Sequence, residues 1–321
     1  MSQQQLKSIS ETPVPHISDP GQENAALQQL LHGREYVLES IPSIPAILQM
    51  LLSELEQPPD NVDLLRVADL IGRDESVAAQ CLRVANSPLI GRGRPADSIR
   101  GAIRTLGIAR TRDIAVSCTI MRIGTSQRVL DPVIFWEHSL GCAILSRKLA
   151  RSVGFESPDK AYLAGLLHDI GYIVNLLIAP QQMKAVLEEG AREHIFAGKV
   201  ENAALGFTHC QSGELLARRW NFPADLVEVI QCHHNPAAAV VNPALVAIVS
   251  LTDRVCRSAD LGLGYAETPD PAANWQKDWE VLTQFCPNAA RMNWEDFVKD
   301  SGSYTEEIQE LVTTMFSARK S

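Results

Sequence analysis

From Glu23 onward, the apolar residues of this 321-residue chain recur at three- and four-residue steps, the spacing that places them along one face of an α-helix. No sustained alternation of apolar and polar residues, which would indicate a half-buried strand, interrupts this pattern. Pro158 and Pro223 each stand where a helix would begin, a position that tolerates proline well. With 45% hydrophobic residues, the chain can bury a substantial core. The sequence therefore predicts an all-α protein.

The two ends of the chain differ from its middle. Residues 1–22 are polar and contain prolines, which predicts a flexible leader without the features of a secretory signal. After about Ser258, "NWEDFVKD" and "TEEIQELVTTMF" are typical of two more amphipathic helices, which pack on the domain or contact a partner. The most apolar internal run, "AAAVVNPALVAIVSLTD", is too short to span a bilayer comfortably, so we expect no membrane association.

Net charge and cysteine content narrow the possible functions. A formal net charge of −9 disfavours a general nucleic-acid-binding protein, because phosphate binding needs a basic face. The seven cysteines are scattered and lack CxxC spacing. That pattern predicts reduced, mostly buried thiols in a cytoplasmic protein.

The charge is unevenly distributed along the chain. Between Val77 and Leu130 there are nine arginines, no lysine and two acidic residues, whereas Ala266 to Glu310 holds ten acidic residues and three basic ones. Two solvated faces would explain this asymmetry. A sharper hypothesis is that the arginine segment binds an anionic partner or a phosphate ligand, or docks on the acidic segment. The residues expected to form this surface are Arg100, Arg104, Arg110 and Arg112.

Five predicted helices direct histidine or aspartate side chains toward apolar surroundings. In "PVIFWEHSLGCAILSRKLA", His138 shares a stripe with Phe135 and Cys142. In "YLAGLLHDIGY", His168 and Asp169 interrupt an apolar helical run. The full set is His138, His168, Asp169, His209, His233, His234 and Asp253.

A common metal site would satisfy all seven groups. A single buried histidine is most often a core residue that donates to a backbone carbonyl, but each unpaired group costs about 1–3 kcal/mol. Imidazoles and carboxylates suit Fe, Mn or Zn, and the absence of cysteine from the set disfavours a structural thiolate zinc site. Neighbouring helical residues point about 100° apart. The pairs His168-Asp169 and His233-His234 could therefore each face two metals, or one metal and the residues around it. The alternative is a hydrogen-bonded polar network without metal.

The order of these residues resembles the signature of the HD superfamily of metal-dependent phosphohydrolases. That signature is a histidine, a histidine-aspartate pair and a distant aspartate, matched here by His138, His168-Asp169 and Asp253. The resemblance implies a site for a divalent metal and, in the active members, hydrolysis of a phosphate ester.

The two-metal HD-GYP branch, which hydrolyses cyclic di-GMP, adds an intervening histidine and a histidine doublet. His209 and His233-His234 match these positions in order. On this resemblance the seven side chains would bind one or two metals, with Asp169 as the bridging carboxylate.

The more extensive resemblance is to the HDOD domain, an output domain of bacterial signalling proteins. "IPSIPAILQMLLSEL", "VADLIGRDESVAAQCLRVANSPLIG" and "SIRGAIRTLGIARTRDIAVS" carry it in the first half, and "AGLLHDIGYIVNLL", "LGFTHCQSGELLARRWNFPADLVEVIQCHHNP" and "VSLTDRVCR" in the second. The match covers about Glu39 to Arg257. It implies a multi-helix bundle with an N-terminal helical part at 23–130, an HD-like core at 131–257 and a C-terminal extension at 258–321.

Two departures from the HD-GYP pattern disfavour hydrolysis. Tyr172 stands where those enzymes have a lysine that helps to hold the scissile phosphate, and "NPAAAVVNP" follows the histidine doublet in place of a Gly-Tyr-Pro segment. A tyrosine cannot supply a fixed positive charge to a phosphate. Metal binding without turnover remains a separate possibility.

Two functions follow from these observations. The first is a regulatory signalling module that binds a partner protein or a nucleotide-like ligand and has a vestigial or metal-occupied HD site, as the resemblance to HDOD domains implies. The second is a metal-dependent phosphohydrolase or cyclic-dinucleotide phosphodiesterase with a metal-bound hydroxide as the nucleophile. The missing substrate groups favour the first.

Overall fold

The computed structural model describes residues 48–50, 64–87, 95–121, 129–259, 261–262 and 275–316. Within these residues the chain is helical and no strand occurs, which confirms the predicted all-α class. The predicted leader, residues 1–22, lies outside the described residues. The boundaries expected near residues 130 and 257 stay predictions.

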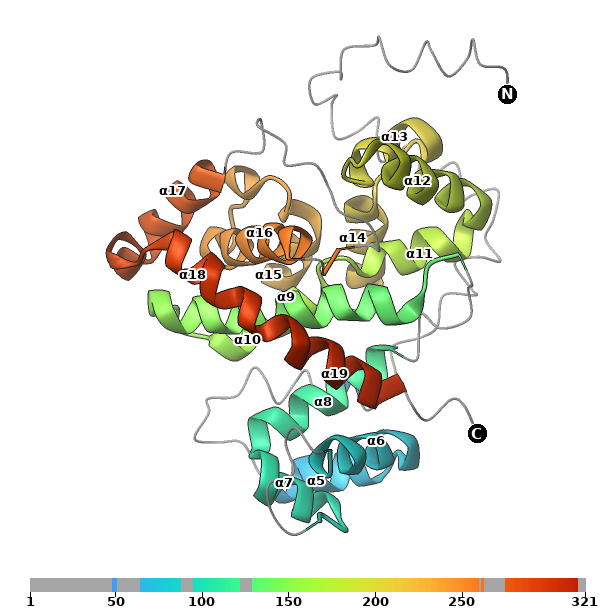
Figure 1. The fold of residues 1–321 in the computed structure, drawn as a ribbon, viewed down its shortest axis with the longest axis vertical. Helices are drawn as coiled ribbons and strands as arrows, with labels where there is room; N and C mark the ends of the chain where they lie inside the picture. Colours follow the sequence, from blue (N-terminus) through green and yellow to red (C-terminus); the bar gives the residue numbers. More distant parts are fainter. Residues whose placement is uncertain are drawn as a thin grey trace.

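The helices are named in chain order, with the numbering used in Figure 1. The α-helices are α5 (Leu64–Gly72), α6 (Glu75–Ala85), α7 (Ile99–Leu106), α8 (Ile108–Met121), α9 (Pro132–Val153), α10 (Pro158–Leu167), α11 (Ile170–Ile178), α12 (Pro180–Glu193), α13 (Gly198–Leu205), α14 (His209–Arg219), α15 (Ala224–Cys232), α16 (Pro243–Ser258), α17 (Trp275–Phe285), α18 (Trp294–Ser301) and α19 (Thr305–Phe316). The 3₁₀ segments are η2 (Pro236–Ala238), η3 (Pro287–Arg291) and η4 (Gly302–Tyr304).

The antiparallel pair α9 and α10 forms the middle of the molecule (Figure 1). Helices α5 to α8 make a layer at one end, while α11 to α14 lie toward the right and α15 to α18 toward the left of the pair in this view, with α14 in contact with α15. Helix α19 crosses α9 and also contacts α6, so the C-terminal helix joins the N-terminal layer to the middle.

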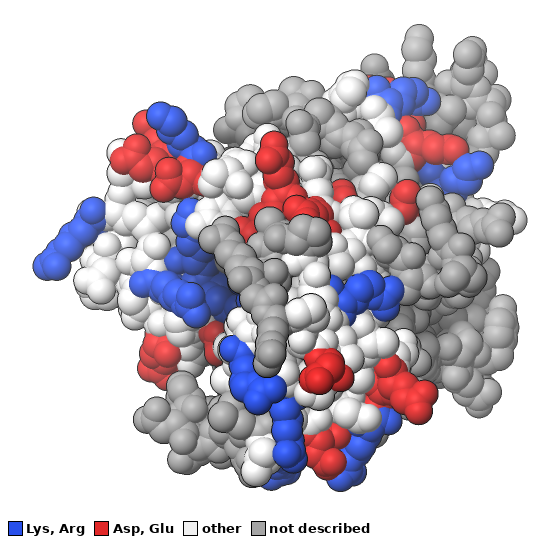
Figure 2. Space-filling model, turned by 60° about the horizontal axis from the view of Figure 1, so that its bottom comes forward, with Lys and Arg blue, Asp and Glu red and all other residues white. Residues whose placement is uncertain are grey.

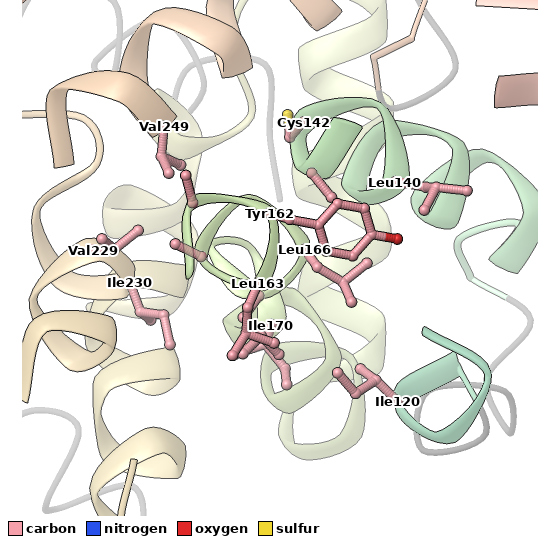
Figure 3. Packing of buried hydrophobic residues seen from close by; sticks show 14 of the residues in the cluster. Ile120, Leu140, Cys142, Tyr162, Leu163, Leu166, Ile170, Val229, Ile230 and Val249 are labelled. Atoms are coloured by element: carbon pink, nitrogen blue, oxygen red, sulfur yellow. The ribbon is translucent and has the colours of Figure 1, made fainter. Parts of the chain in front are cut away.

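Helix α10 and the start of α11 occupy the centre of the hydrophobic core (Figure 3). Their side chains are surrounded by residues from four other helices, namely Ile120 of α8, Leu140 and Cys142 of α9, Val229 and Ile230 of α15, and Val249 of α16. By length and composition, Pro158–Ile178 could cross a membrane, but 94% of its apolar stretch is buried inside the fold. It is therefore a core segment, as are many apolar helices of globular proteins.

Two glycines allow the helices that carry polar residues to approach closely. A Cβ added to Gly165 would come within 2.6 Å of the Cys142 carbonyl oxygen, so a side chain there would push α10 away from α9. A Cβ added to Gly171 would overlap the carbonyl group of His209, at the contact of α11 with α14. Both contacts bring potential metal ligands on different helices together.

We expect Gly165→Ala to lower the free energy of unfolding by about 1–3 kcal/mol, because α9 and α10 must separate to admit the methyl group. Urea denaturation measures this change. Gly72→Ala is the matched control, since an added Cβ at Gly72 meets nothing within 4 Å. Equal destabilisation by the two substitutions would contradict the packing explanation.

Candidate metal centre

The structure brings all seven predicted ligand side chains to one buried point between α9, α10, α14, α15 and α16. His138 and Asp253 come from the middle of α9 and α16. The other residues lie at helix ends: the His168-Asp169 pair between α10 and α11, His209 at the first residue of α14, and the histidine doublet just after α15.

Local hydrogen bonds explain why two helices end at these histidines. The last carbonyl groups of a helix have no intrahelical partner. His168 Nδ1 lies 2.8 Å from the Gly165 carbonyl oxygen, and His233 Nδ1 lies 3.1 Å from those of Val229 and Ile230. Each ring therefore donates its Nδ1 proton to its own helix end. The continuous helix implied by the run "YLAGLLHDIGY" is thus broken at His168.

A buried carboxylate orients His209. Glu201 of α13 is fully buried, and its Oε2 accepts from the Nδ1 and the backbone N–H of His209, at 2.6 and 2.9 Å. Its Oε1 accepts from Asn175 Nδ2 at 3.0 Å. In the same way, His138 Nδ1 donates to the Leu261 carbonyl oxygen at 2.7 Å. Such partners fix the tautomer of metal-binding histidines.

With Nδ1 occupied in this way, the Nε2 atoms of these four histidines point at Asp169. Its Oδ2 lies 3.3 Å from His138 Nε2 and 3.4 Å from His168 Nε2. Its Oδ1 lies 3.4 Å from the Nε2 atoms of both His209 and His233. The carboxylate thus divides the centre into two halves. Asp253 completes the first half, at 3.4 Å from His138 Nε2, and His234 completes the second, at 3.1 Å from His209 Nε2.

With neutral imidazoles, as metal binding requires, these contacts leave electron pairs facing each other without protons between them. A neutral imidazole protonated at Nδ1 has only a lone pair at Nε2, and a carboxylate only accepts. His138 and His168 nevertheless approach to 3.3 Å through their Nε2 atoms, and Asp169 Oδ1 has no hydrogen-bond donor. Ligands of a tetrahedral ion with bonds of about 2.1 Å are about 3.4 Å apart. The donor set therefore fits one or two divalent cations.

Protons compete with a metal for this centre. Burial opposes a charged imidazole at His138, but Asp169 and Asp253 outweigh burial and raise the pKa of His138 well above its ordinary value. At His234, burial and then the neighbouring histidines hold the pKa well below that value. Because metal binding must displace bound protons, it is expected to weaken as the pH falls.

The centre is closed on the sides that the structure describes. Six of the seven side chains are at most 6% exposed, and only His234 is more open, at 27%. The Phe196 ring lies over His234 with 4.5 Å between centroids. The guanidinium carbon of Arg257 lies over the Phe196 ring, 4.6 Å from its centroid, and Arg257 Nη2 pairs with Asp253 Oδ2 at 2.9 Å.

Tyr172, at the position of the HD-GYP lysine, is fully buried inside the protein. Its ring stacks on that of His209, with centroids 4.3 Å apart and an angle of 12° between the planes. The Tyr172 ring thus packs against the face of the His209 ring and presents no positive charge to the centre.

Two of the four predicted surface arginines are engaged within the protein. Arg112 of α8 is 4% exposed, and its Nη2 lies 2.7 Å from Asp159 Oδ2. It is unavailable to a surface ligand, which corrects that part of the prediction. Arg110 Nη2 lies 2.9 Å from Glu307 Oε1 of α19, as docking of the arginine segment on the acidic segment would require.

The other two arginines, Arg100 and Arg104, are exposed on α7. An anionic partner for them stays a prediction. On the face seen in Figure 2, basic and acidic side chains lie side by side rather than in separate regions.

Sequence reasoning missed several residues at the centre. Cys142 and Cys210 have sulfur atoms beside the histidines, although cysteine was excluded from the expected ligand set. The signal was present, because Cys142 follows His138 by one helical turn and Cys210 follows His209 directly. Glu201 had no such signal, because its role depends on the packing of α13 against α14.

Comparisons with known proteins agree with this architecture. The HDOD domain family matches residues 41–236, more than half of the chain. An HDOD domain protein of unknown function from Geobacter sulfurreducens has a similar crystal structure, with a TM-score of 0.76 and 28% identity over 90% of this chain and 98% of the other. A curated, uncharacterised protein from Treponema pallidum is 24% identical over 72% of this chain, which spans 45% of that protein's length.

Two less similar structures share the fold. One, from Shewanella amazonensis, is provisionally named a phosphohydrolase and has a TM-score of 0.65, with 20% identity over 91% of this chain and 98% of the other. The other, from Marinobacter aquaeolei, is provisionally named a signal transduction protein and has a TM-score of 0.72, with 20% identity over 97% of this chain and 65% of the other. The match to the family model over residues 41–236, more than half of the chain, shows that the chain belongs to the HDOD domain family.

Proposed function

We propose that this protein is a cytoplasmic regulatory module of bacterial signal transduction. Its HD-like centre binds one or two divalent metal ions without hydrolysing a phosphate ester. The signal passes to a partner protein, with a nucleotide-like ligand as the alternative. Metal ions at the centre would hold α9, α10, α14, α15 and α16 in one arrangement, since each of these helices or its end contributes a ligand.

The observation that carries this proposal is the low exposure of the ligands, with the Phe196 and Arg257 side chains next to the most exposed one. Structural metal sites fill their coordination positions with protein ligands, whereas catalytic sites keep one open for water or substrate. Here Phe196 lies against His234, the most exposed ligand, and Arg257 lies over the Phe196 ring. A bulky phosphodiester would have to displace both side chains to reach an ion beside Asp169.

A second observation supports the contact with a partner. The histidine doublet leads into a loop that exposes Val240 and Val241, at 86% and 56%. The buried carboxylate of Glu228 accepts three consecutive backbone N–H groups of residues 240–242 at 2.6–2.8 Å, which fixes the shape of this loop. Exposed apolar side chains on a fixed loop suit a protein contact, and this loop begins at the metal ligands.

A turnover assay tests the proposal. Protein purified without an affinity tag is analysed for metal, loaded with Mn²⁺, Fe²⁺ or Zn²⁺, and incubated with cyclic dinucleotides and simple phosphate esters. We expect bound metal and no turnover. Hydrolysis that is lost in Asp169→Ala would replace this proposal with the phosphohydrolase. Absence of any bound metal would contradict the metal-occupied centre.

The alternative, a metal-dependent phosphohydrolase, is favoured by one specific feature. Arg257 is a cation within reach of the centre, and its guanidinium could turn from Asp253 toward a phosphate once Phe196 moved. This would supply the positive charge that Tyr172 does not.

Removal of the Phe196 ring distinguishes a permanently closed metal site from an active site that opens for substrate. We expect Phe196→Ala to speed the transfer of bound metal to a chelator several-fold, because the ring over His234 is lost, and to create no turnover. Absorbance of a chelator dye follows the transfer. Phe285→Ala, which removes an exposed ring outside the centre, is the control. Equal exchange rates in the wild type and Phe196→Ala would show that this ring does not close the site.

A further inference from the structure

Two thiols lie inside the candidate metal centre, one in each half. Cys210 Sγ is 3.5 Å from His209 Nε2, and Cys142 Sγ is 3.8 Å from His138 Nε2. The side chains of His209, Cys210, His233 and His234 offer four donor atoms that all lie within 4.8 Å of one another. The second half of the centre thus has a sulfur atom among its nitrogens.

The separation between Cys210 and His209 fits two ligands of one ion. A tetrahedral ion with a metal–sulfur bond of about 2.3 Å and a metal–nitrogen bond of about 2.05 Å puts sulfur and nitrogen about 3.6 Å apart. The nitrogen concerned is Nε2, because Nδ1 of His209 is held by Glu201. The sulfur therefore lies beside the lone pair that a metal would use.

The two thiols differ in their surroundings. Cys142 is completely buried, and although it belongs to a donor group with His138, His168 and Asp253, its thiol also interacts with that of Cys256. Cys210 is partly exposed in the first turn of α14, and its sulfur contacts His209 Nε2. Packing does not explain why its sulfur points at a ligand nitrogen.

We propose that Cys210 is a thiolate ligand of the metal ion in the second half of the centre. This inference rests on the proposed metal centre and specifies its chemistry. Binding forms a metal–sulfur bond and breaks the S–H bond, and the proton passes to solvent without any change in oxidation state. The ion then has His209, Cys210, His233 and His234 as ligands, and Asp169 Oδ1 as a fifth ligand that bridges the two halves.

This ligand set determines which metals bind and what they can do. Thiolate and imidazole ligands favour Zn²⁺, Fe²⁺ and Co²⁺ over Mg²⁺ and Mn²⁺. Five protein ligands, counting the bridging Asp169, also leave no coordination position on such an ion for water. The second half would therefore hold a structural ion, in agreement with the closed cover over His234.

Cobalt binding to the full-length, metal-free protein tests the proposal under anaerobic conditions with a thiol-free reductant. A thiolate bound to Co²⁺ gives a charge-transfer band in the near ultraviolet, and imidazoles and carboxylates do not. We expect the band in the wild type and its loss in Cys210→Ser and Cys210→Ala. We also expect zinc affinity to fall by more than the roughly 10–100-fold typical for losing an outer partner.

The controls distinguish the possible failures. Cys232→Ser is the matched control, because Cys232 is also partly exposed and precedes His233 but lies outside the group of donor atoms. It should keep the full band. Cobalt binding without a band, or a band lost only in Cys142→Ser, would overturn the role of Cys210 and leave the metal centre standing. Absence of any cobalt binding would overturn the metal centre itself.

Discussion

Asp169→Ala is expected to abolish metal binding in both halves of the centre. Each oxygen of Asp169 faces the Nε2 atoms of two histidines, at 3.3–3.4 Å, so the substitution removes a ligand from both positions at once. It also removes the negative charge that balances a divalent ion inside the core. Metal analysis by mass spectrometry should fall from one or two ions per chain to none.

The same substitution should remove the stabilisation that metal provides. An ion that binds only the folded state at a concentration about 1,000 times its Kd stabilises the protein by about 4 kcal/mol. Addition of metal should therefore raise the Tm of the wild type and leave that of Asp169→Ala unchanged. Asp278→Ala is the control, because Asp278 is also buried and accepts from Ser250 and Arg254 outside the centre. Metal retained by Asp169→Ala would refute the bridging role.

The sequence predicts this centre well where a ligand lies in the middle of a helix. His138 and Asp253 are such residues, and the 3.6-residue period correctly indicates that they face inward. His168, His209 and His233 lie at helix ends, where the period no longer defines a direction. Their grouping could be predicted only from the order of motifs shared with the HD superfamily.

The features that the sequence did not predict depend on contacts between segments that are distant along the chain. The hydrogen bond from His209 to Glu201 requires the packing of α13 against α14, and no spacing rule indicates it. Burial of Arg112 likewise depends on an acidic partner 47 residues away, so a composition count placed it on the surface. Side-chain pairing across helices, rather than helix formation, is the limit of sequence reasoning here.

Among the four arginines predicted to lie on the surface, Arg112 is the one whose substitution by alanine is expected to destabilise the protein most. Its partner Asp159 begins α10, and Arg147 of α9 pairs with both Asp159 and Asp113. Removal of Arg112 leaves carboxylates of this buried group short of a cation, which typically costs about 3–5 kcal/mol. Because the Asp159 side chain is 38% exposed and partly screened, we expect about 3 kcal/mol in urea denaturation.

Arg110→Ala is the matched control, two residues earlier on the same helix. Its pair with Glu307 is exposed, at 48% and 35%, so its loss should cost about 0–1 kcal/mol. A double-mutant cycle between Arg112 and Asp159 isolates the pair from the loss of packing. Similar costs for Arg110→Ala and Arg112→Ala would contradict the buried role of Arg112.

The stability difference between the wild type and Arg112→Ala depends on pH, and its direction follows from the pKa shift of Asp159. Burial acts to raise the pKa of Asp159, but Arg147 and Arg112 outweigh it and hold the pKa below its ordinary value. The ion pair therefore contributes fully above the unfolded pKa of about 4 and loses its contribution as the pH falls through the lower folded pKa. The gap in stability between the wild type and Arg112→Ala should narrow in that acidic range. Since the pair links α8 to α10, acid would loosen the N-terminal layer from the helices that carry the metal ligands.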